Sequence, residues 1–258
     1  MYFVIEKDEG HELKKACDYL NWYRQEKVAS YYTPDNGVPR WKDGNGCIPV
    51  GSVDFVHKYL MTYYGLEPKP LNVPECLMWP DFTCRKIFNG TYMDAKKGYF
   101  AKSNNKVGIK PFFWRLDIVS YIQSKNQIGD LDCHPKKKSH FDDYVSNLFT
   151  DKWQFSEPVD FKAEWRCFVF KNELVGLQPY AGEIGVFPCM ETIHKMISIF
   201  EDESPIAYTL DVGIIGNKTA IIEVHNFYSV GLYGFTRHDI LPYMYSGWFK
   251  EYLRKEGK

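Results

Sequence analysis

Two acidic residues near the C-terminus occupy positions where an antiparallel hairpin would bring them together. The runs 208–215 and 219–224 have the alternating pattern of strands, and Asp211 and Glu223 each lie six positions from Asn217 in the turn between them. Paired strands place such residues opposite each other on one face. Like charges that face each other across strands are unfavourable unless a positive group lies between them.

A divalent metal ion is one positive group that this pair can hold. Hard cations such as Mg²⁺ bind carboxylate and amide oxygens, so we predict a metal site at Asp211 and Glu223 with Asn226 as a third oxygen ligand. The opposite face of the hairpin is expected to be apolar, with Leu210, Val212, Ile214, Ile222 and Val224. The simpler interpretation is that the two acids are solvated on a surface hairpin.

The elements that position these residues begin with a strand at 2–5, followed by apolar residues at helical spacing from Leu13 to Leu20. A helix is predicted from 53 to about 64, with Ser52 as its N-cap. The run 65–80 has four prolines in sixteen residues, which predicts a linker.

A second group of elements follows this linker. We expect a strand at 99–103, a helical piece at 118–123, a polar loop at 126–139, a hairpin of 164–170 with 174–180, and helices at 191–200 and about 240–254. In the first strand of that hairpin, alternation places Arg166 on the face opposite Trp165.

The composition is that of a folded globule large enough to bury a substantial core. The 258 residues are 45% hydrophobic, 25% charged and 17% aromatic, with a formal net charge of −1. This charge provides no overall attraction to nucleic acid, and the lysines at 136–138 are expected to form a solvated loop.

The cysteine pattern favours a reducing environment. Seven cysteines form no C-x-x-C pair, and an odd number leaves at least one thiol unpaired. The chain also lacks an apolar run of membrane-spanning length and a secretory leader, so we expect a cytoplasmic protein without a membrane partner.

The series Lys102, Lys110, Arg166, Asp211 and Glu223 resembles the ATP-grasp superfamily. More narrowly, it is similar to the bacterial and phage clade of that superfamily that is named for one arginine and two lysines. The matching segments are 49–52, 100–103, 110–112, 155–159, 164–169, 208–213 and 222–226. One departure is Ser103, where the family usually has proline after the strand lysine.

The resemblance implies an α+β fold in which two subdomains hold ATP, preceded by a small α/β domain. Residues 1–80 would form this N-terminal domain and 81–258 the ATP-grasp domain, with a lid subdomain at about 81–154 and a C-terminal subdomain at about 155–258. A phage-encoded protein of this kind would act in the host cytoplasm. The flexible phosphate loop of the family has a candidate at 103–108.

The resemblance also implies roles for individual residues. Lys102 would contact the α- and β-phosphates, Lys110 the phosphates or the adenine edge, and Arg166 the γ-phosphate or an acylphosphate. Glu157, in the segment 154–159, would meet the adenine and ribose. Asp211, Glu223 and Asn226 would hold Mg²⁺ against the phosphates.

Each of these residues also has a simpler interpretation. The two lysines can be surface residues, Arg166 can pair with Glu164 or another acid, Glu157 can be a turn residue, and His225 can be structural or a further residue of the cleft.

The function expected from this reasoning is an ATP- and Mg²⁺-dependent ligase that joins a carboxylate to an amine through an acylphosphate, acting on an amino acid, a peptide or another small molecule. One alternative is a nucleotide-binding protein without turnover that binds a partner or host protein through the aromatic residues of 227–245, which can equally be core. A covalent nucleotidyltransferase at Lys42-Asp43-Gly44 is a third alternative, although a turn explains that run more simply.

Overall fold

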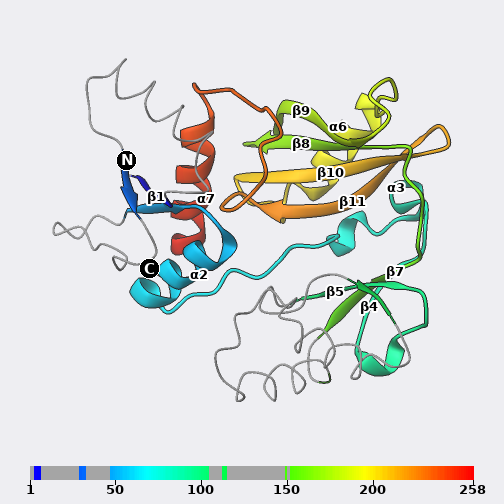
Figure 1. Cartoon of the computed structure of the whole chain (residues 1–258), viewed down its shortest axis with the longest axis horizontal. Coiled ribbons are helices and arrows are strands. Elements are labelled where there is room, and N and C mark those ends of the chain that lie inside the picture. The colour runs from blue at the N-terminus through cyan, green and yellow to red at the C-terminus, as the bar shows by residue number, and fades with distance from the viewer. Residues whose placement is uncertain (1–2, 7–28, 33–46, 105–111, 115–148, 150–151) are drawn as a thin grey trace.

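The chain folds into three small sheets with helices packed around two of them (Figure 1). The structure is a computed structural model that describes residues 3–6, 29–32, 47–104, 112–114, 149 and 152–258. The predicted helices at 13–20 and 118–123 and the loop at 126–139, with its lysines, lie outside these residues.

The N-terminal sheet is parallel, with strand order β2-β1-β3. Its strands are β1 (Phe3–Glu6), β2 (Ala29–Tyr32) and β3 (Ile48–Val50), and helix α2 (Val53–Tyr64) follows directly. Ser52 caps α2 as predicted, because its hydroxyl accepts a hydrogen bond from the Phe55 amide at 3.2 Å.

The middle sheet is antiparallel, with strand order β4-β7-β5-β6. Its strands are β4 (Ile87–Gly90), β5 (Phe100–Ser103), β6 (Phe112–Phe113) and β7 (Trp153–Ser156). The segment that leads to it contains a 3₁₀ turn at Glu75–Leu77 and the short helix α3 (Pro80–Thr83), and a second 3₁₀ turn at Tyr92–Asp94 follows β4.

The C-terminal sheet is also antiparallel, with strand order β11-β10-β8-β9. Both predicted hairpins are in it: β8 (Ala163–Phe170) with β9 (Glu173–Gly182), and β10 (Ala207–Ile215) with β11 (Lys218–Asn226). Helix α6 (Met190–Phe200) covers one face with the four apolar residues that the sequence predicted, Ile193, Met196, Ile197 and Phe200.

The acidic hairpin differs from its prediction in two details. Ile215 pairs directly with Lys218, so the turn consists of two residues rather than three. The register then shifts after Asp211, because β11 carries one extra residue at Ile222. This bulge sends Ile221 into the core and leaves Ile222 only half-buried, so the expectation that Ile222 belongs to the apolar face was wrong.

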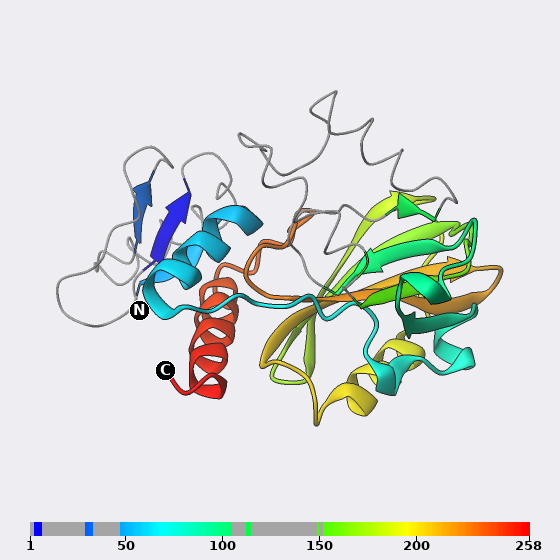
Figure 2. The same cartoon turned by 90° about the horizontal axis from the view of Figure 1, so that it is seen from below.

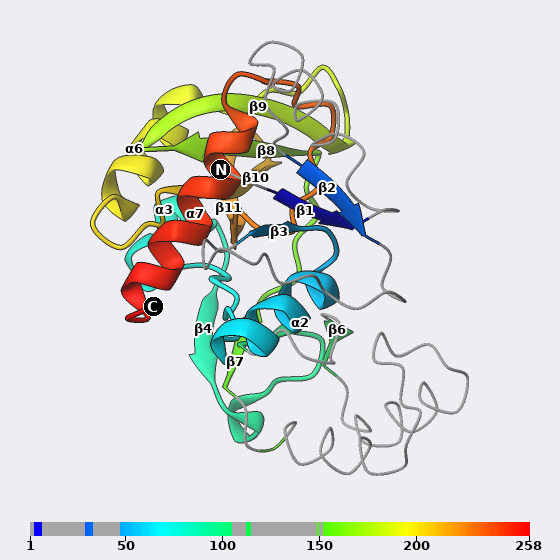
Figure 3. The same ribbon diagram turned by 90° about the vertical axis from the view of Figure 1, so that its left-hand side faces the viewer.

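The last helix, α7 (Leu241–Lys255), lies between the N-terminal strands and the C-terminal sheet, and it contacts both β3 and β10 (Figures 2 and 3). One apolar cluster therefore includes residues of β1, β3, α2 and α7. Most large aromatic residues of 227–245 are buried in this cluster, which supports their interpretation as core. Tyr233 is the exception at 47% exposure.

No helix in the described part of the chain is long and apolar enough to cross a membrane.

Candidate functional site

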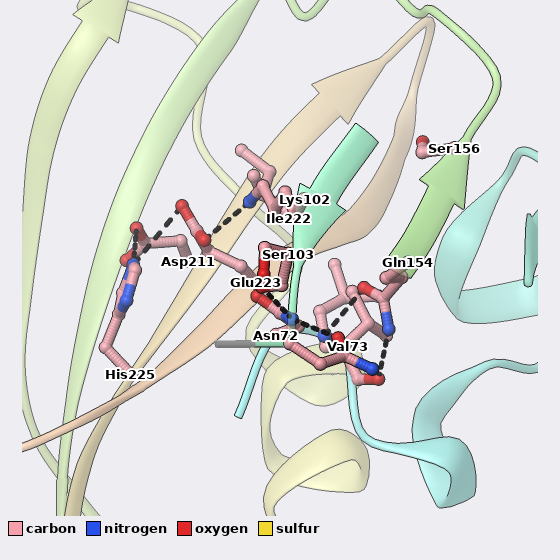
Figure 4. A network of polar contacts seen from close by, with 12 residues as sticks. Asn72, Val73, Lys102, Ser103, Gln154, Ser156, Asp211, Ile222, Glu223 and His225 are labelled. Atoms are coloured by element: carbon pink, nitrogen blue, oxygen red, sulfur yellow. Dashed lines mark hydrogen bonds and ion pairs between the residues drawn. The ribbon is translucent and has the colours of Figure 1, made fainter. Parts of the chain in front are cut away.

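Charged side chains from the middle and C-terminal sheets meet at the predicted acidic pair (Figure 4). Asp211 on β10 and Glu223 on β11 are direct cross-strand partners, as the sequence predicted. Lys102 comes from β5 of the middle sheet and His225 from β11, and these two approach the acids from opposite sides.

Arg166 is held by a two-pronged ion pair with Asp211. It lies opposite Asp211 in the pairing of β8 with β10, and its Nε and Nη2 donate to the two carboxylate oxygens at 2.8 and 2.7 Å. Nη1 donates to the Gly231 carbonyl at 3.0 Å. A guanidinium has five N–H groups, so these bonds leave two donors for a ligand.

Two tyrosine rings cover the Arg166 guanidinium. Its central carbon lies 5.0 Å from the centre of the Tyr233 ring and 5.8 Å from that of Tyr180. Burial alone would lower the pKa of Arg166, but the Asp211 carboxylate outweighs that effect and raises it. Arg166 therefore stays charged although its exposure is only 7%.

Glu223 is neutralised from two directions. Its Oε2 accepts a hydrogen bond from Lys102 Nζ at 2.5 Å, and its Oε1 lies 3.2 Å from His225 Nε2. Burial alone would raise the pKa of Glu223, but Lys102 and His225 together hold it well below its usual range. Burial would lower the pKa of His225, whereas Glu223 and Asp211 raise it above its ordinary value.

The positive groups expected between the acids are thus partly supplied by the protein itself. A carboxylate has about four lone-pair positions, so these contacts do not exhaust the acids. Asp211, Glu223 and His225 each offer a ligand atom, and all three atoms lie within 4.8 Å of one another. Two carboxylates and an imidazole that face one point are a donor set that fits a divalent metal ion.

Asn226 does not join this group, contrary to its predicted role. Its side-chain amide donates to the Lys69 carbonyl at 2.9 Å and accepts from Trp248 Nε1 at 3.0 Å. Successive residues of a strand point to opposite faces, so the residue that accompanies Glu223 is His225, two positions on. The same alternation that predicted the acidic pair could have identified His225 from the sequence.

Glu157 lies just after β7, where the chain leaves the middle sheet. Its carboxylate accepts hydrogen bonds from the Lys86 amide at 2.9 Å and the Tyr99 hydroxyl at 3.1 Å. These bonds, that of the Lys86 amide first, lower the pKa of Glu157. Glu157 therefore links three segments of the middle sheet at the start of the passage to β8.

Other predicted residues lie outside the described part of the chain. These are Lys110, the Lys42-Asp43-Gly44 run and most of the candidate phosphate loop at 103–108.

Sequence reasoning missed a strap that joins the two antiparallel sheets. The Asn72 carbonyl accepts from the Val224 amide on β11 at 2.7 Å, and its side chain donates to Asn104 at 2.8 Å, just beyond β5. The Val73 N–H and C=O both bond to the side-chain amide of Gln154 on β7 at 3.0 Å (Figure 4). These contacts flank Lys102 and Glu223. An Asn within a proline-rich run gave no signal of them.

Arg85 was also missed, and it supports the bulge beside Glu223. Its Nη1 donates to the Ile221 carbonyl at 2.7 Å and its Nε to the Ser156 hydroxyl at 2.7 Å. Burial lowers the pKa of Arg85 to about 10. This side chain fixes the backbone of β11 at the point where its register shifts.

Comparison with known proteins agrees with this architecture. A family model described as an ATP-grasp domain, the second family of its clade, matches residues 130–242. Among curated proteins, no sequence match is found.

Solved structures are similar over most of the chain, with low sequence identity. The D-alanine–D-alanine ligase of Bacillus anthracis aligns with a TM-score of 0.51 and 10% identity over 100% of both chains. A RimK domain ATP-grasp protein of Sphaerobacter thermophilus gives a TM-score of 0.47 and 12% identity over 96% of this chain and 98% of its own. The L-amino acid ligase of Bacillus licheniformis gives 0.46 and 9%, over 92% of this chain and 71% of its own.

The family model and the alignment with the ligase of Bacillus anthracis establish the fold that the sequence predicted. The chain has an ATP-grasp fold, and the charged site lies where its two antiparallel sheets meet.

Proposed function

We propose that this protein is an ATP-dependent ligase that joins a carboxylate to an amine through an acylphosphate and releases ADP and phosphate. The observation that carries the proposal is the meeting of Lys102 and Arg166 with Asp211 and Glu223 on an ATP-grasp fold. This arrangement brings cations for phosphates and acids for a metal to one place.

Phosphoryl transfer requires mainly positioning and charge neutralisation. Arg166 is suited to this role because Asp211 and Gly231 fix its guanidinium while two N–H donors remain. Lys102 uses one of its three donors on Glu223, and the others can bind phosphate oxygens. Lys110 is proposed as the second phosphate-binding lysine on the family resemblance alone.

Asp211 and Glu223 are the residues proposed to hold the divalent metal, and Mg²⁺ is the ion expected from the resemblance. When bound, such an ion neutralises charge on the phosphate oxygens of the nucleotide. Glu157 and the backbone of 154–159 are proposed to contact the adenine and ribose, and the middle sheet to act as the lid subdomain.

The proposed reaction has two steps. A carboxylate oxygen of the donor substrate attacks the γ-phosphorus of ATP, the bond from that phosphorus to the bridging oxygen breaks, and ADP leaves. The amine of the acceptor then attacks the acyl carbon, phosphate leaves with its oxygen, and the amine nitrogen gives up a proton. The substrates are proposed to be an amino acid, a peptide or another small molecule with these groups.

The proposal is tested by ADP release and by trapping of the acylphosphate. Wild-type protein is incubated with ATP, a divalent metal and a panel of amino acids and peptides, with hydroxylamine added to convert an acylphosphate to a hydroxamate. We expect carboxylate-dependent ADP and hydroxamate from the wild type and strongly reduced amounts from Glu223→Gln. Glu183→Gln, which changes an exposed acid outside the site, should behave as the wild type.

Nucleotide binding is measured separately from turnover. A ligand that binds only the native state adds roughly 2.7 kcal/mol of stability at about one hundred times its Kd, so ATP with metal should raise the melting temperature of the wild type. Binding without ADP formation, with every substrate pair, would instead favour a nucleotide-binding partner protein. The burial of most aromatics in 227–245 removes the surface first considered for such a partner.

A further inference from the structure

His225 gives the acidic pair a ligand type that the oxygen-only prediction did not include. It lies on the same face of β11 as Glu223, and its ring is half-buried against both acids. We propose that Asp211, Glu223 and His225 form a metal site that selects a first-row transition ion such as Mn²⁺ over Mg²⁺.

The spacing of the three ligand atoms suits a shared metal ion. His225 Nε2 lies 3.2 Å from Glu223 Oε1 and 3.6 Å from Asp211 Oδ2. Two ligands bound at about 2.1 Å to one ion are about 3.0 Å apart at a right angle and about 3.4 Å apart at a tetrahedral angle. The observed separations are close to both values, so small side-chain adjustments suffice.

The remaining contacts of the two acids orient these atoms. Glu223 directs Oε2 to Lys102 and therefore turns Oε1 toward the imidazole. Asp211 gives Oδ1 to Arg166 Nε and shares Oδ2 between Arg166 Nη2 and the imidazole. The cations on the outer sides of the acids thus hold the inner oxygens in place, as partners of metal ligands do in general.

The imidazole determines the selectivity. Mg²⁺ prefers oxygen ligands in a near-octahedral arrangement and gives up water reluctantly. Imidazole nitrogen favours transition ions over Mg²⁺, while carboxylates also suit Mn²⁺. An amide at position 225 would have kept an all-oxygen set, and the amide that the chain does have, on Asn226, is bonded to Lys69 and Trp248 instead.

The inference rests on the proposed nucleotide site for the metal's role, but it is tested by metal binding without nucleotide. Free Mn²⁺ is followed by electron paramagnetic resonance during titration of the full chain, and Mg²⁺ is then added as a competitor. We expect the ratio of the Mg²⁺ Kd to the Mn²⁺ Kd to fall about tenfold in His225→Asn. His194→Asn, which changes an exposed histidine on α6, should leave the ratio unchanged.

A second measurement does not depend on how the variant folds. Electron-spin-echo spectra of Mn²⁺ bound to the wild type should contain the coupling of an imidazole nitrogen, and that coupling should be absent from folded His225→Asn. Failure of the wild type to bind Mn²⁺, absence of the coupling, or an equal Kd ratio in wild type and variant each overturns the inference.

The nucleotide measurement separates this inference from the proposed function. Stabilisation by ATP, together with any of those negative metal results, would reject the selectivity and leave the ligase proposal standing. ADP formation supported equally by both metals in wild type and His225→Asn would reject it as well. Loss of both nucleotide and metal binding in the wild type would reject both proposals.

Discussion

Arg166 and Asp211 form a buried ion pair whose partners depend on each other. Their exposures are 7% and 1%, and the two hydrogen bonds between them use both carboxylate oxygens. The loss of one partner of such a pair leaves an uncompensated charge away from water. The pair therefore fixes the charge at the centre of the site before any ligand arrives.

Asp211→Asn is accordingly expected to lower the free energy of unfolding by about 3–5 kcal/mol, because Arg166 loses its counter-charge while it remains buried. The measurement is urea denaturation without added metal. Arg237→Met breaks the exposed pair with Asp239 and should cost less than about 1 kcal/mol. Equal losses in the two variants would contradict this account of Asp211.

His225 should give the metal-free protein a specific dependence on pH. Burial lowers its pKa, but Glu223 and Asp211 raise it to a net value above that of the unfolded chain. A group with a raised folded pKa stabilises fully below its unfolded pKa, about 6.5, and that contribution disappears as pH rises through the folded pKa.

With chelator present, the free energy of unfolding of the wild type should therefore decrease as pH rises from about 6.5. His225→Gln should lack this component, so the difference between the two proteins is measured by urea denaturation at a series of pH values. A constant difference across that range would show that the ion pairs of His225 do not contribute in this way.

At the scale of elements, the strap at Asn72 and Val73 determines how the two antiparallel sheets meet. Gln154 contributes most directly, because its side-chain amide bonds both the N–H and the C=O of Val73 and is 6% exposed. Lys102 is the cross-strand neighbour of Gln154 in the pairing of β5 with β7. The strap thus supports the strand that carries Lys102.

Gln154→Leu should lower the free energy of unfolding by about 2–3 kcal/mol, because both backbone groups of Val73 lose buried partners. Asn89→Ala removes another partner of the Gln154 amide, at 3.3 Å, on an exposed residue and should cost less than about 1 kcal/mol. Thermal and urea unfolding measure both. A Gln154→Leu protein as stable as Asn89→Ala would mean that the strap is not held by these bonds.

The strands and hairpins were accessible from the sequence because they depend on local rules. Alternation predicted that Asp211 faces Glu223 and that Arg166 is turned away from Trp165. The bulge at Ile222 was not accessible, because it is supported by Arg85, which is more than 130 positions away. Lys102 approaches Glu223 from another sheet, and only the family resemblance suggested that the two belong to one site.

At the scale of the whole molecule, α7 connects the N-terminal sheet to the C-terminal sheet. Trp248 and Phe249 are each 3% exposed, and they share a core with Phe3, Val4 and Ile5 of β1. The N-terminal sheet therefore does not have a core of its own. Its stability depends on a helix from the opposite end of the sequence.

Phe249→Ala should cost about 3–5 kcal/mol, as large-to-small changes in a packed core do. The loss should also reach the N-terminal sheet, so hydrogen exchange of the amides at 3–6 should accelerate along with that of α7. Lys250→Ala, at an exposed position of the same helix, should change neither quantity. Protection of 3–6 that survives Phe249→Ala would show that the sheet is stable without α7.

The shared core also affects how the chain is made. β1 leaves the ribosome first, yet the residues that cover its apolar side chains are in α7, about two hundred and forty positions later. During synthesis the middle and C-terminal sheets can form while the first strands wait. Release factors or a stalled ribosome that end translation before α7 would leave those strands uncovered, which makes the last helix a checkpoint for the completeness of the newly made protein.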